Sequence, residues 1–293
     1  MEHLVSEGGA VIYNPTAGRG HGGGLVEQAK SLIGSGFEWI PTQRAGHAVE
    51  LAREAAKNHQ IVAAFGGDGT VSDVAKGLFG TEATLGIIPV GTGNDYARNL
   101  NLPLDLPEAI NTVLNGVVRR VDVGIINDIP FINNAGTGFD AQVMETMNTS
   151  IRFTKGRPAF MLAILKNFVT YKPFTVQMTI NDDPPRKERA LMISVLNGKM
   201  YGAGMQAAPH ADMDDGLLDV LLIKSVPKFK LISVIAKIGT GQHLGEEGVE
   251  MLKVRSLKIE ATPTQPLNVD GDIRGATPAT ISIKPRAMKV LVR

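Results

Sequence analysis

The sequence predicts an α/β protein, in which a parallel sheet covered by helices is followed by an antiparallel β-sandwich. Two observations carry this prediction. In the first part of the chain, short apolar runs alternate with segments of helical periodicity, which is typical of parallel sheets with helices on both faces. From about Val121, strand-like segments follow one another, separated by Pro, Gly, Asn and Asp. We therefore expect an α/β domain over residues 1–124 and a sandwich domain over residues 125–293, whose last strand could return to the first domain.

In the first domain, each expected strand leads into a turn and a helix. The expected strands are Ala10–Tyr13, Phe37–Ile40, Ile61–Phe65 and Leu85–Ile88. Apolar residues at helical spacing place helices over Leu25–Ile33, residues 47–58 and Val71–Leu78. Ligands of such sheets bind beyond the carboxyl ends of the strands, and glycine clusters follow three of these strands. This edge of the sheet is where we expect a ligand.

The second domain is expected to consist mainly of strands. They are Phe174–Ile180, Arg189–Leu196, Leu217–Ile223, Met251–Ala261 and Thr280–Ile283. Two helical segments interrupt them, Pro158–Val169 and Lys228–Ile238.

Composition excludes several classes of function. The 293 residues include 30 Lys and Arg against 29 Asp and Glu, a net charge of +1, so no global field draws the chain to nucleic acid. The absence of cysteine excludes disulfides, thiolate metal sites and a cysteine nucleophile, and it fits a reducing cytoplasm. The N-terminus lacks the basic start and apolar stretch of a signal peptide, so we expect a cytoplasmic protein.

Contact with a membrane surface is one of two interpretations of the segment around residue 160. The most apolar window, Phe160–Leu165, ends at Lys166 and is far shorter than the roughly 20 residues that span a bilayer. Arg152, Lys155 and Arg157 precede it, and this basic-then-apolar order suits peripheral contact with an anionic bilayer. A core helix with a solvated, charged start fits the same pattern.

The run Phe65–Thr70, with the sequence FGGDGT, points to phosphate binding. Glycines let backbone N–H groups approach phosphate oxygens closely, and the start of the following helix adds its dipole. Because phosphates would repel a bare carboxylate, Asp68 is interpreted as a magnesium partner, directly or through water. The alternative is a tight turn in which Asp68 caps its own helix.

Two other glycine motifs are less specific. Gly18–Gly23 matches the dinucleotide pattern G-x-G-x-x-G, but Asn14 and Pro15 separate it from its strand, and Glu38 lies inside a strand rather than at its end. The match to a nicotinamide enzyme is therefore weak. Pro89–Asp95 gives a further turn with hydroxyl, amide and carboxylate groups. The pattern G-x-x-x-x-G-K-[ST] is absent, which excludes a P-loop protein.

Taken together, four motifs resemble the diacylglycerol kinase and sphingosine kinase catalytic family, most closely its bacterial lipid kinases. They are NPTAGRG from Asn14, FGGDGT from Phe65, PVGTGND from Pro89 and VDGD from Val269. The resemblance extends from Val11 to about Ile283. It implies a nucleotide-binding domain of the NAD kinase and diacylglycerol kinase type, a β-sandwich domain for the lipid, an active site in the cleft between them, and a homodimer.

The resemblance also implies roles for individual residues. Asn14, Pro15, Thr16, Ala17 and Gly18 are expected to hold nucleotide phosphates, with Thr42 near the nucleotide, and the site is completed by Gly66, Gly67, Asp68, Gly69, Thr70, Asp73 and Thr92. The aspartates that match a magnesium and water network are Asp68, Asp95 and Asp122. Where the family has GGDGTxNE, this chain has Ser72 and Asp73, which keep the polar character but change the reach of the side chains.

The sharper departure from the family is at the general base. Bacterial members usually carry D-G-E late in the chain, and the glutamate takes the proton of the lipid hydroxyl. This chain has Asp272 in its place. Aspartate has nearly the same unperturbed pKa, but it is one methylene, roughly 1.5 Å, shorter, which matters for positioning. Asp270, two residues earlier, is the next candidate for the base.

The acidic cluster His210–Asp219 fits a metal-binding turn. Its spacing does not match an EF-hand, because the sixth and twelfth positions counted from Asp212 are not Gly and Glu. The resemblance implies a structural Mg²⁺ bound by the Asp212 carbonyl, the Asp215 carboxylate and the Leu217 carbonyl. An ordinary turn entering the next strand is the alternative.

The sequence therefore predicts an ATP-dependent lipid kinase that uses Mg²⁺. It transfers the γ-phosphoryl group directly to a hydroxyl of a diacylglycerol-like or other amphiphilic lipid, with Asp68, Asp95 and Asp272 as the catalytic residues. Two alternatives stay open. One is a nucleotide-binding regulatory protein of the same fold with an impaired base, and the other is a relative of NAD kinase, which shares GGDG but leaves GTGND and VDGD unexplained.

Overall fold

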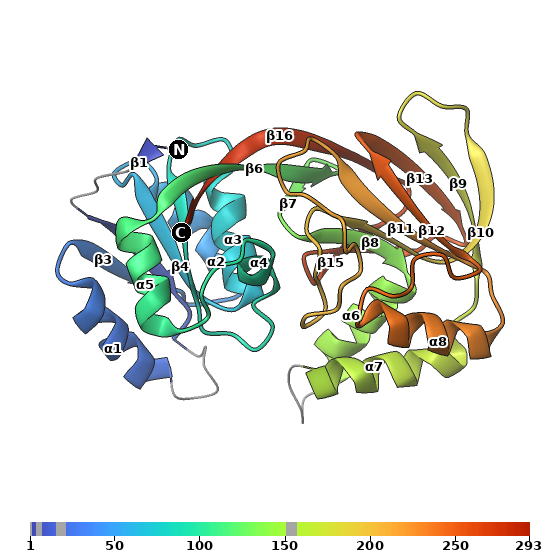
Figure 1. The fold of residues 1–293 in the computed structure, drawn as a ribbon, viewed down its shortest axis with the longest axis horizontal. Coiled ribbons are helices and arrows are strands. Elements are labelled where there is room, and N and C mark those ends of the chain that lie inside the picture. The colour runs from blue at the N-terminus through green and yellow to red at the C-terminus, as the bar shows by residue number, and fades with distance from the viewer. Residues whose placement is uncertain (1, 4–7, 16–21, 151–156) are drawn as a thin grey trace. The chain divides into compact units, whose positions relative to one another are not determined.

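The computed structural model describes residues 2–3, 8–15, 22–150 and 157–293. The chain forms two compact units (Figure 1). Unit 1 comprises Met1–Val121 and Arg286–Arg293, and unit 2 comprises Asp122–Pro285. The strands β6 (Val117–Ile126) and β16 (Ala279–Val292) each begin in one unit and end in the other.

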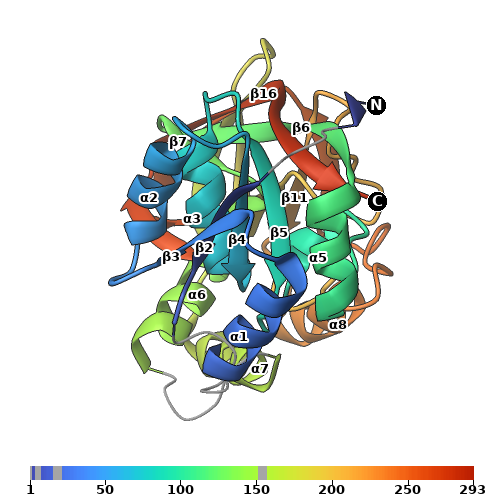
Figure 2. The same cartoon turned by 90° about the vertical axis from the view of Figure 1, so that its left-hand side faces the viewer.

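Unit 1 is a parallel sheet with helices on both faces. Its strands are β2 (Gly9–Tyr13), β3 (Phe37–Pro41), β4 (Ile61–Gly66) and β5 (Thr84–Pro89), in the order β3-β2-β4-β5, and the end of β16 pairs in parallel with β5. Figure 2 shows α1 (Gly22–Ile33) and α5 (Leu106–Asn115) on one side of this sheet, and α2 (His47–Ala55) and α3 (Asp68–Leu78) on the other. Because both faces are covered, β4 and β5 are buried along their whole length.

Two short elements complete unit 1. The strand β1 (Glu2–His3) pairs with β6. The helix α4 (Asp95–Asn99) follows the loop after β5, and its first residues are buried.

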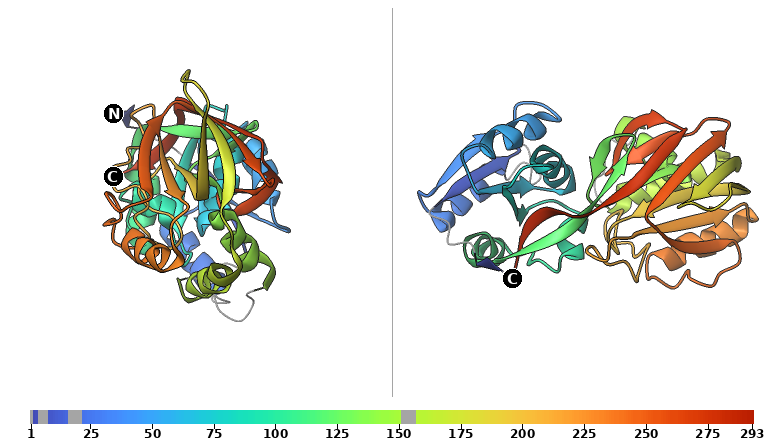
Figure 3. Two further views of the ribbon diagram at one scale, coloured as in Figure 1. Left: turned by 90° about the vertical axis from the view of Figure 1, so that its right-hand side faces the viewer. Right: turned by 90° about the horizontal axis from the view of Figure 1, so that it is seen from above.

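Unit 2 is built from antiparallel strands with helices along one side (Figure 3). Its strands, besides parts of β6 and β16, are β7 (Ile129–Phe131), β8 (Asn134–Gly138), β9 (Phe174–Ile180), β10 (Arg186–Leu196), β11 (Leu218–Lys224), β12 (Val249–Val254), β13 (Ser256–Thr262), β14 (Pro266–Val269) and β15 (Asp272–Ala276). The order β15-β14-β8-β10-β9-β13-β16 forms one path, and β11 and β12 extend from β10. The helices are α6 (Phe139–Ser150), α7 (Arg157–Thr170) and α8 (Lys228–Ile238).

The predicted fold class, a parallel α/β sheet followed by an antiparallel sandwich, is confirmed. One predicted strand, Met251–Ala261, is wrong: it is two strands, β12 and β13, separated at Arg255. The side chain of Asn181 accepts hydrogen bonds from the backbone N–H groups of Arg255 (2.8 Å) and Ser256 (3.1 Å) and so interrupts the ladder. As a result β12 pairs with β11, whereas β13 pairs with β9 and β16.

No helix within the described ranges combines the length and the apolar character that crossing a membrane requires.

Candidate functional site

In unit 1, the predicted nucleotide-binding residues follow the carboxyl ends of neighbouring parallel strands. Asn14 and Pro15 follow β2, Thr42 follows β3, Gly66–Thr70 ends β4 and opens α3, and Thr92 lies exposed in the loop after β5. Because the strands are parallel and adjacent, these ends share one edge of the sheet. Thr16, Ala17 and Gly18 lie outside the described residues.

Some glycines at this edge are required by close packing, whereas Gly69 is not. A Cβ on Gly91 would lie 2.4 Å from the Cα of Gly67, so packing between the β4 and β5 loops requires this glycine. A Cβ on Gly66 would lie 2.5 Å from Thr70 Oγ1, so Gly66 makes room for the first turn of α3. A Cβ on Gly69, in contrast, would meet no atom within 4 Å among the described residues. Glycine is a poorer helix former than alanine, by about 1 kcal/mol in a helix interior. The open space at Gly69 therefore suits a ligand that approaches the backbone N–H groups of α3 closely.

Asp68 joins the two glycine-rich loops. The alternative in which Asp68 caps its own helix is wrong, because Gly67 is the N-cap of α3 and Asp68 lies in the first turn. Its Oδ1 instead accepts a hydrogen bond of 3.2 Å from the backbone N–H of Tyr96, at the start of α4. Burial raises the pKa of the Asp68 carboxyl, and the backbone N–H groups at the start of α4 oppose that rise.

The loop before α4 is held by Asn94. Its side chain accepts from Gly91 N at 3.0 Å and donates to Gly91 O at 3.1 Å, and its φ of 54° lies in the left-handed region that asparagine tolerates. Asp95 follows as the first residue of α4 and is buried. Asp73 lies one turn further along α3 and is half-buried.

In unit 2, Asp272 follows a two-residue hairpin turn. Asp270 (φ 49°) and Gly271 (φ 94°) form this turn between β14 and β15, and Val269 pairs with Asp272. The Asp272 side chain is 51% exposed, and its Oδ2 accepts from Arg274 Nη2 at 2.9 Å. Residues two apart on a strand share a face, which brings this ion pair together.

Asp270 has a different task. Its carboxylate accepts hydrogen bonds from the backbone N–H groups of Ile132 (3.1 Å), Asn133 (3.0 Å) and Asn134 (3.0 Å). These contacts fasten the hairpin turn to the segment that enters β8. Asp270 is therefore a weaker candidate for the base than its position in the sequence indicated.

The predicted metal-binding turn holds an ammonium group. Asp215 Oδ1 accepts from Leu217 N at 2.9 Å, and Asp215 Oδ2 lies 2.6 Å from Lys253 Nζ. Asp212 is exposed, and within the described ranges no group of three or more His, Asp or Glu side chains gathers in a way that could hold a metal. Two of the three predicted ligands are backbone carbonyls rather than side chains, so the magnesium site stays a prediction.

Two buried carboxylates lie close to this turn. Asp122 Oδ2 accepts from Gly216 N at 2.7 Å, so this predicted member of the magnesium network holds the turn itself. The Asp219 side chain is only 3% exposed, its Oδ2 lies 4.0 Å from Lys253 Nζ, and burial raises the pKa of Asp219 to about 6. Lys253 thus supplies a positive charge that compensates the negative charge of buried carboxylates.

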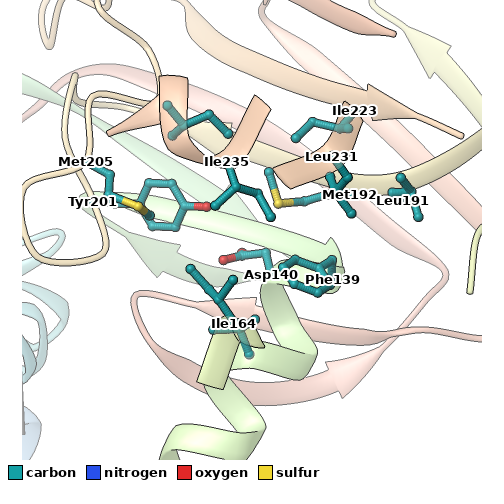
Figure 4. Close-up of a pocket in the computed structure, with 12 residues that line it drawn as sticks. Phe139, Asp140, Ile164, Leu191, Met192, Tyr201, Met205, Ile223, Leu231 and Ile235 are labelled. Atoms are coloured by element: carbon teal, nitrogen blue, oxygen red, sulfur yellow. The ribbon is translucent and has the colours of Figure 1, made fainter. Parts of the chain in front are cut away.

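Sequence reasoning missed Asp140, a buried carboxyl group in the first turn of α6. Its Oδ2 accepts from Asn268 Nδ2 at 2.9 Å, and Figure 4 shows the side chain among apolar residues, with the Tyr201 ring nearby. Burial raises the pKa of Asp140 to about 6, against the opposing effects of Asn268 and Tyr201. A signal was present in the sequence GTGFD: a Cβ on Gly136 would lie 2.4 Å from Asp140 Oδ2, so that glycine makes room for the carboxylate.

We expect Asp140 to make the stability of the protein depend on pH. At pH values between 3.8, the ordinary pKa of this carboxyl, and about 6, its pKa in the folded state, Asp140 carries a proton in the folded state but not in the unfolded state. The contribution of Asp140 to stability therefore falls as pH rises from about 4 to about 6. Asp140→Asn should gain stability relative to the parent over this range, by roughly 3 kcal/mol.

Denaturant unfolding at a series of pH values measures this difference. Asp182→Asn, which removes a carboxylate at an exposed position, is the matched control. A constant difference for Asp140→Asn would contradict the prediction.

The parallel sheet followed by an antiparallel sandwich is the fold of the NAD kinase and diacylglycerol kinase class. Residues 9–126 match the family model of the diacylglycerol kinase catalytic domain, and residues 133–292 match that of the YegS C-terminal NAD kinase beta sandwich-like domain. Diacylglycerol kinase from Bacillus subtilis strain 168 is 31% identical over 278 residues, which span 92% of this chain and 90% of that protein. The chain therefore belongs to the bacterial diacylglycerol kinase and YegS-like lipid kinase family, and it is a kinase.

Solved structures agree with this assignment. A candidate diacylglycerol kinase from Bacillus anthracis strain Sterne has a TM-score of 0.84 at 26% identity, covering 99% of this chain and 96% of that chain. An NAD kinase from Archaeoglobus fulgidus, in complex with ATP, shares the fold alone, with a TM-score of 0.51 at 15% identity, covering 97% of this chain and 93% of that chain.

Proposed function

We propose that the protein transfers the γ-phosphoryl group of ATP to a hydroxyl of a diacylglycerol-like or other amphiphilic lipid. The observation that carries the proposal is the edge of the sheet in unit 1, where glycine-rich loops follow neighbouring parallel strands and a Cβ on the exposed Gly69 would meet no described atom within 4 Å. Membership of the lipid kinase family supports the acceptor, because the Bacillus subtilis relative is a diacylglycerol kinase. The NAD kinase from Archaeoglobus fulgidus, which has the same fold, was solved in complex with ATP, and this supports the donor.

The nucleotide is assigned to the loops at this edge. The residues proposed to contact it are Asn14, Pro15, Thr16, Ala17, Gly18, Thr42, Gly66, Gly67, Asp68, Gly69, Thr70, Asp73 and Thr92. The backbone N–H groups at the start of α3 are free of intrahelical partners by geometry, so they are suited to phosphate oxygens. Asp68 and Asp95 supply the carboxylates of the same loops.

Mg²⁺ is the metal that fits these carboxylates. Asp68 is held in place by the start of α4, and burial raises its pKa, so a nearby divalent cation would favour its ionised form. Bound there with the nucleotide, magnesium supplies positive charge that neutralises the phosphates during transfer.

Asp272 is proposed as the general base. A kinase that phosphorylates an alcohol needs a group that takes the hydroxyl proton, and the position of Asp272 after the D-G turn is that of the family's glutamate. Its exposure leaves it accessible to a substrate, and its ion pair with Arg274 engages only Oδ2.

The structural magnesium at the turn around Asp215 stays part of the proposal, supported by the buried carboxyl of Asp219. We expect Asp215→Ala to melt at a lower temperature in magnesium and to lose most of the stabilisation that added magnesium gives the parent. A cation bound only to the folded chain stabilises it by about 3 kcal/mol at about a hundred times its Kd.

Melting temperatures with magnesium and with chelator measure this response. Lys253→Met is the matched control: it frees the Asp215 carboxylate from its ammonium partner, so its response to magnesium should equal or exceed that of the parent. An Asp215→Ala variant that responds to magnesium like the parent would assign the cluster to an ordinary turn.

The amphiphilic acceptor implies a cytoplasmic protein at the membrane periphery, because such lipids reside in bilayers. Three basic residues predicted this membrane contact. Arg152 and Lys155 lie outside the described residues, while Arg157 is the first residue of α7. A homodimer also belongs to the proposal, and it rests on the resemblance to bacterial lipid kinases alone.

Two rival functions can be separated from this one by a single assay. The ion pair of Asp272 with Arg274 favours a regulatory protein that binds nucleotide without efficient transfer. The shared fold favours an NAD kinase relative. ATP turnover measured with lipid micelles, with NAD and with no acceptor distinguishes them: the proposal expects turnover only with lipid. Turnover only with NAD, or with no acceptor at all, would overturn it.

A further inference from the structure

The helices α7 and α8 of unit 2 form an apolar groove on the surface. They lie side by side in Figure 1, and the groove has a volume of about 610 Å³. Its wall residues include Leu162, Leu165, Phe168, Met205, Ile232 and Ile235. A groove of this size lies in the range of pockets that bind small apolar molecules.

Large apolar side chains are exposed along this groove. Leu162 is 49% exposed and Leu165 64% exposed on α7, and Ile232 is 56% exposed on α8. Between these residues on α7, Ala163 is buried in the core of unit 2, and Ile164 is buried where the groove meets that core. The helix is therefore apolar on two sides, although packing within unit 2 covers only one of them.

The charges of the two helices have one sign. Arg157 and Lys166 on α7, and Lys228, Lys230 and Lys237 on α8, are accompanied by no Asp or Glu in either helix. Lys230 and Lys237 pair with Glu247 and Glu246 in the loop after α8. Lys166 is exposed, and no carboxylate of the described residues lies within 4.0 Å of its ammonium group.

We propose that the α7–α8 groove docks onto an anionic lipid bilayer, with Leu162, Leu165 and Ile232 inserted among the lipids. Apolar side chains flanked by cations are the composition that binds anionic membrane surfaces. A second copy of this chain is a poorer occupant, because a two-fold symmetric contact would bring the cations of α7 and α8 against their own copies. The proposal deepens the proposed function by naming the face that meets the membrane, and it rests on that function for the lipid nature of the partner.

A small cavity lies next to the groove. A cavity of about 30 Å³ shares Ile164, Met205 and Ile235 with the groove, and these three side chains are labelled in Figure 4. Both are lined mainly by apolar side chains, with the Asp140 carboxyl at the cavity.

Co-sedimentation with phosphatidylcholine vesicles, with and without admixed phosphatidylglycerol, tests the proposal in the absence of ATP. The parent should bind the anionic vesicles more strongly. The double variant Leu165→Glu with Ile232→Glu should bind them at least about tenfold more weakly, because it removes apolar contacts and adds like charge. Lys166→Glu should lower binding to anionic vesicles roughly tenfold and leave binding to neutral ones unchanged.

The matched control is Leu32→Glu, which places the same charge at an apolar residue that is 43% exposed on α1 of unit 1. It should bind like the parent. Parent protein that binds neither vesicle, or both equally, overturns the proposal, as does binding that the groove variants leave unchanged. If the protein does not bind vesicles but forms a dimer that Leu165→Glu dissociates, the face is a site of self-association instead.

This outcome is separable from the proposed function. Protein that phosphorylates a lipid in detergent micelles but leaves vesicles unbound keeps the kinase function and loses the docking surface. Protein that binds anionic vesicles through the groove but transfers no phosphoryl group keeps the docking surface alone.

Discussion

Asp68→Asn is expected to lower kcat at least about a hundredfold while the chain stays folded. The carboxylate lies among loops suited to phosphates, where a negative charge is favourable only next to a cation. Asparagine keeps the oxygen that accepts from Tyr96 N, 3.2 Å away in the parent, so the start of α4 should stay in place. What the substitution removes is the charge.

The matched control is Asp105→Asn in the same unit. Asp105 is the N-cap of α5 and accepts from Glu108 N at 3.4 Å, so it too is an aspartate that binds backbone N–H groups at the start of a helix. Asparagine caps helices about as well as aspartate, so this variant should keep both its stability and its kcat. Steady-state kinetics with varied magnesium measure the effect, and near-normal turnover of Asp68→Asn would remove Asp68 from the mechanism.

Asp272→Asn is expected to lower lipid phosphorylation by about 10²–10⁴, the usual contribution of a general base. Nucleotide binding, which belongs to loops of unit 1, should stay nearly unchanged. Initial rates together with equilibrium binding of a nucleotide analogue separate these two effects. A loss smaller than tenfold would point to another base, and Asp270 is a poor substitute because three backbone N–H groups already occupy its carboxylate.

Two companion variants sharpen this test. Arg274→Gln removes the ion pair at 2.9 Å but leaves Asp272 intact, so it should change the rate far less than Asp272→Asn. Asp272→Glu restores the side-chain length usual in the family and should raise activity or cost little. A severe loss in Asp272→Glu would instead indicate an aspartate whose reach is already matched to its substrate.

The parallel sheet could be predicted because its signals are local. Its strands are short apolar runs, and β3, β4 and β5 end at proline or glycine. The strand β4 differs from its predicted bounds by one residue at its end, and β5 by one residue at each end. The helix α8 and the strand β9 match their predicted bounds. The helix α6 was missed because its residues are largely polar and show no clear apolar stripe.

The partners of the acidic residues could not be predicted, because they are distant in sequence. Asp68 contacts a backbone group 28 residues away, Asp140 pairs with a side chain 128 residues away, and Asp270 binds N–H groups 136 to 138 residues away. Sequence spacing shows which acids stand near glycines, but not which of them are committed to holding the fold. The predicted nucleotide, metal and base roles themselves stay predictions that the variants above address.

The most direct test of the lipid kinase account follows the label of γ-labelled ATP. The purified protein is incubated with magnesium, labelled ATP and diacylglycerol in mixed micelles, and the lipid is extracted and separated. A lipid kinase should form labelled phospholipid in the organic phase, in proportion to ADP, and the Asp68→Asn variant should form none. ADP formed without labelled lipid across a panel of diacylglycerol, sphingoid base, phosphatidylglycerol and isoprenoid alcohol would contradict the proposed lipid kinase function.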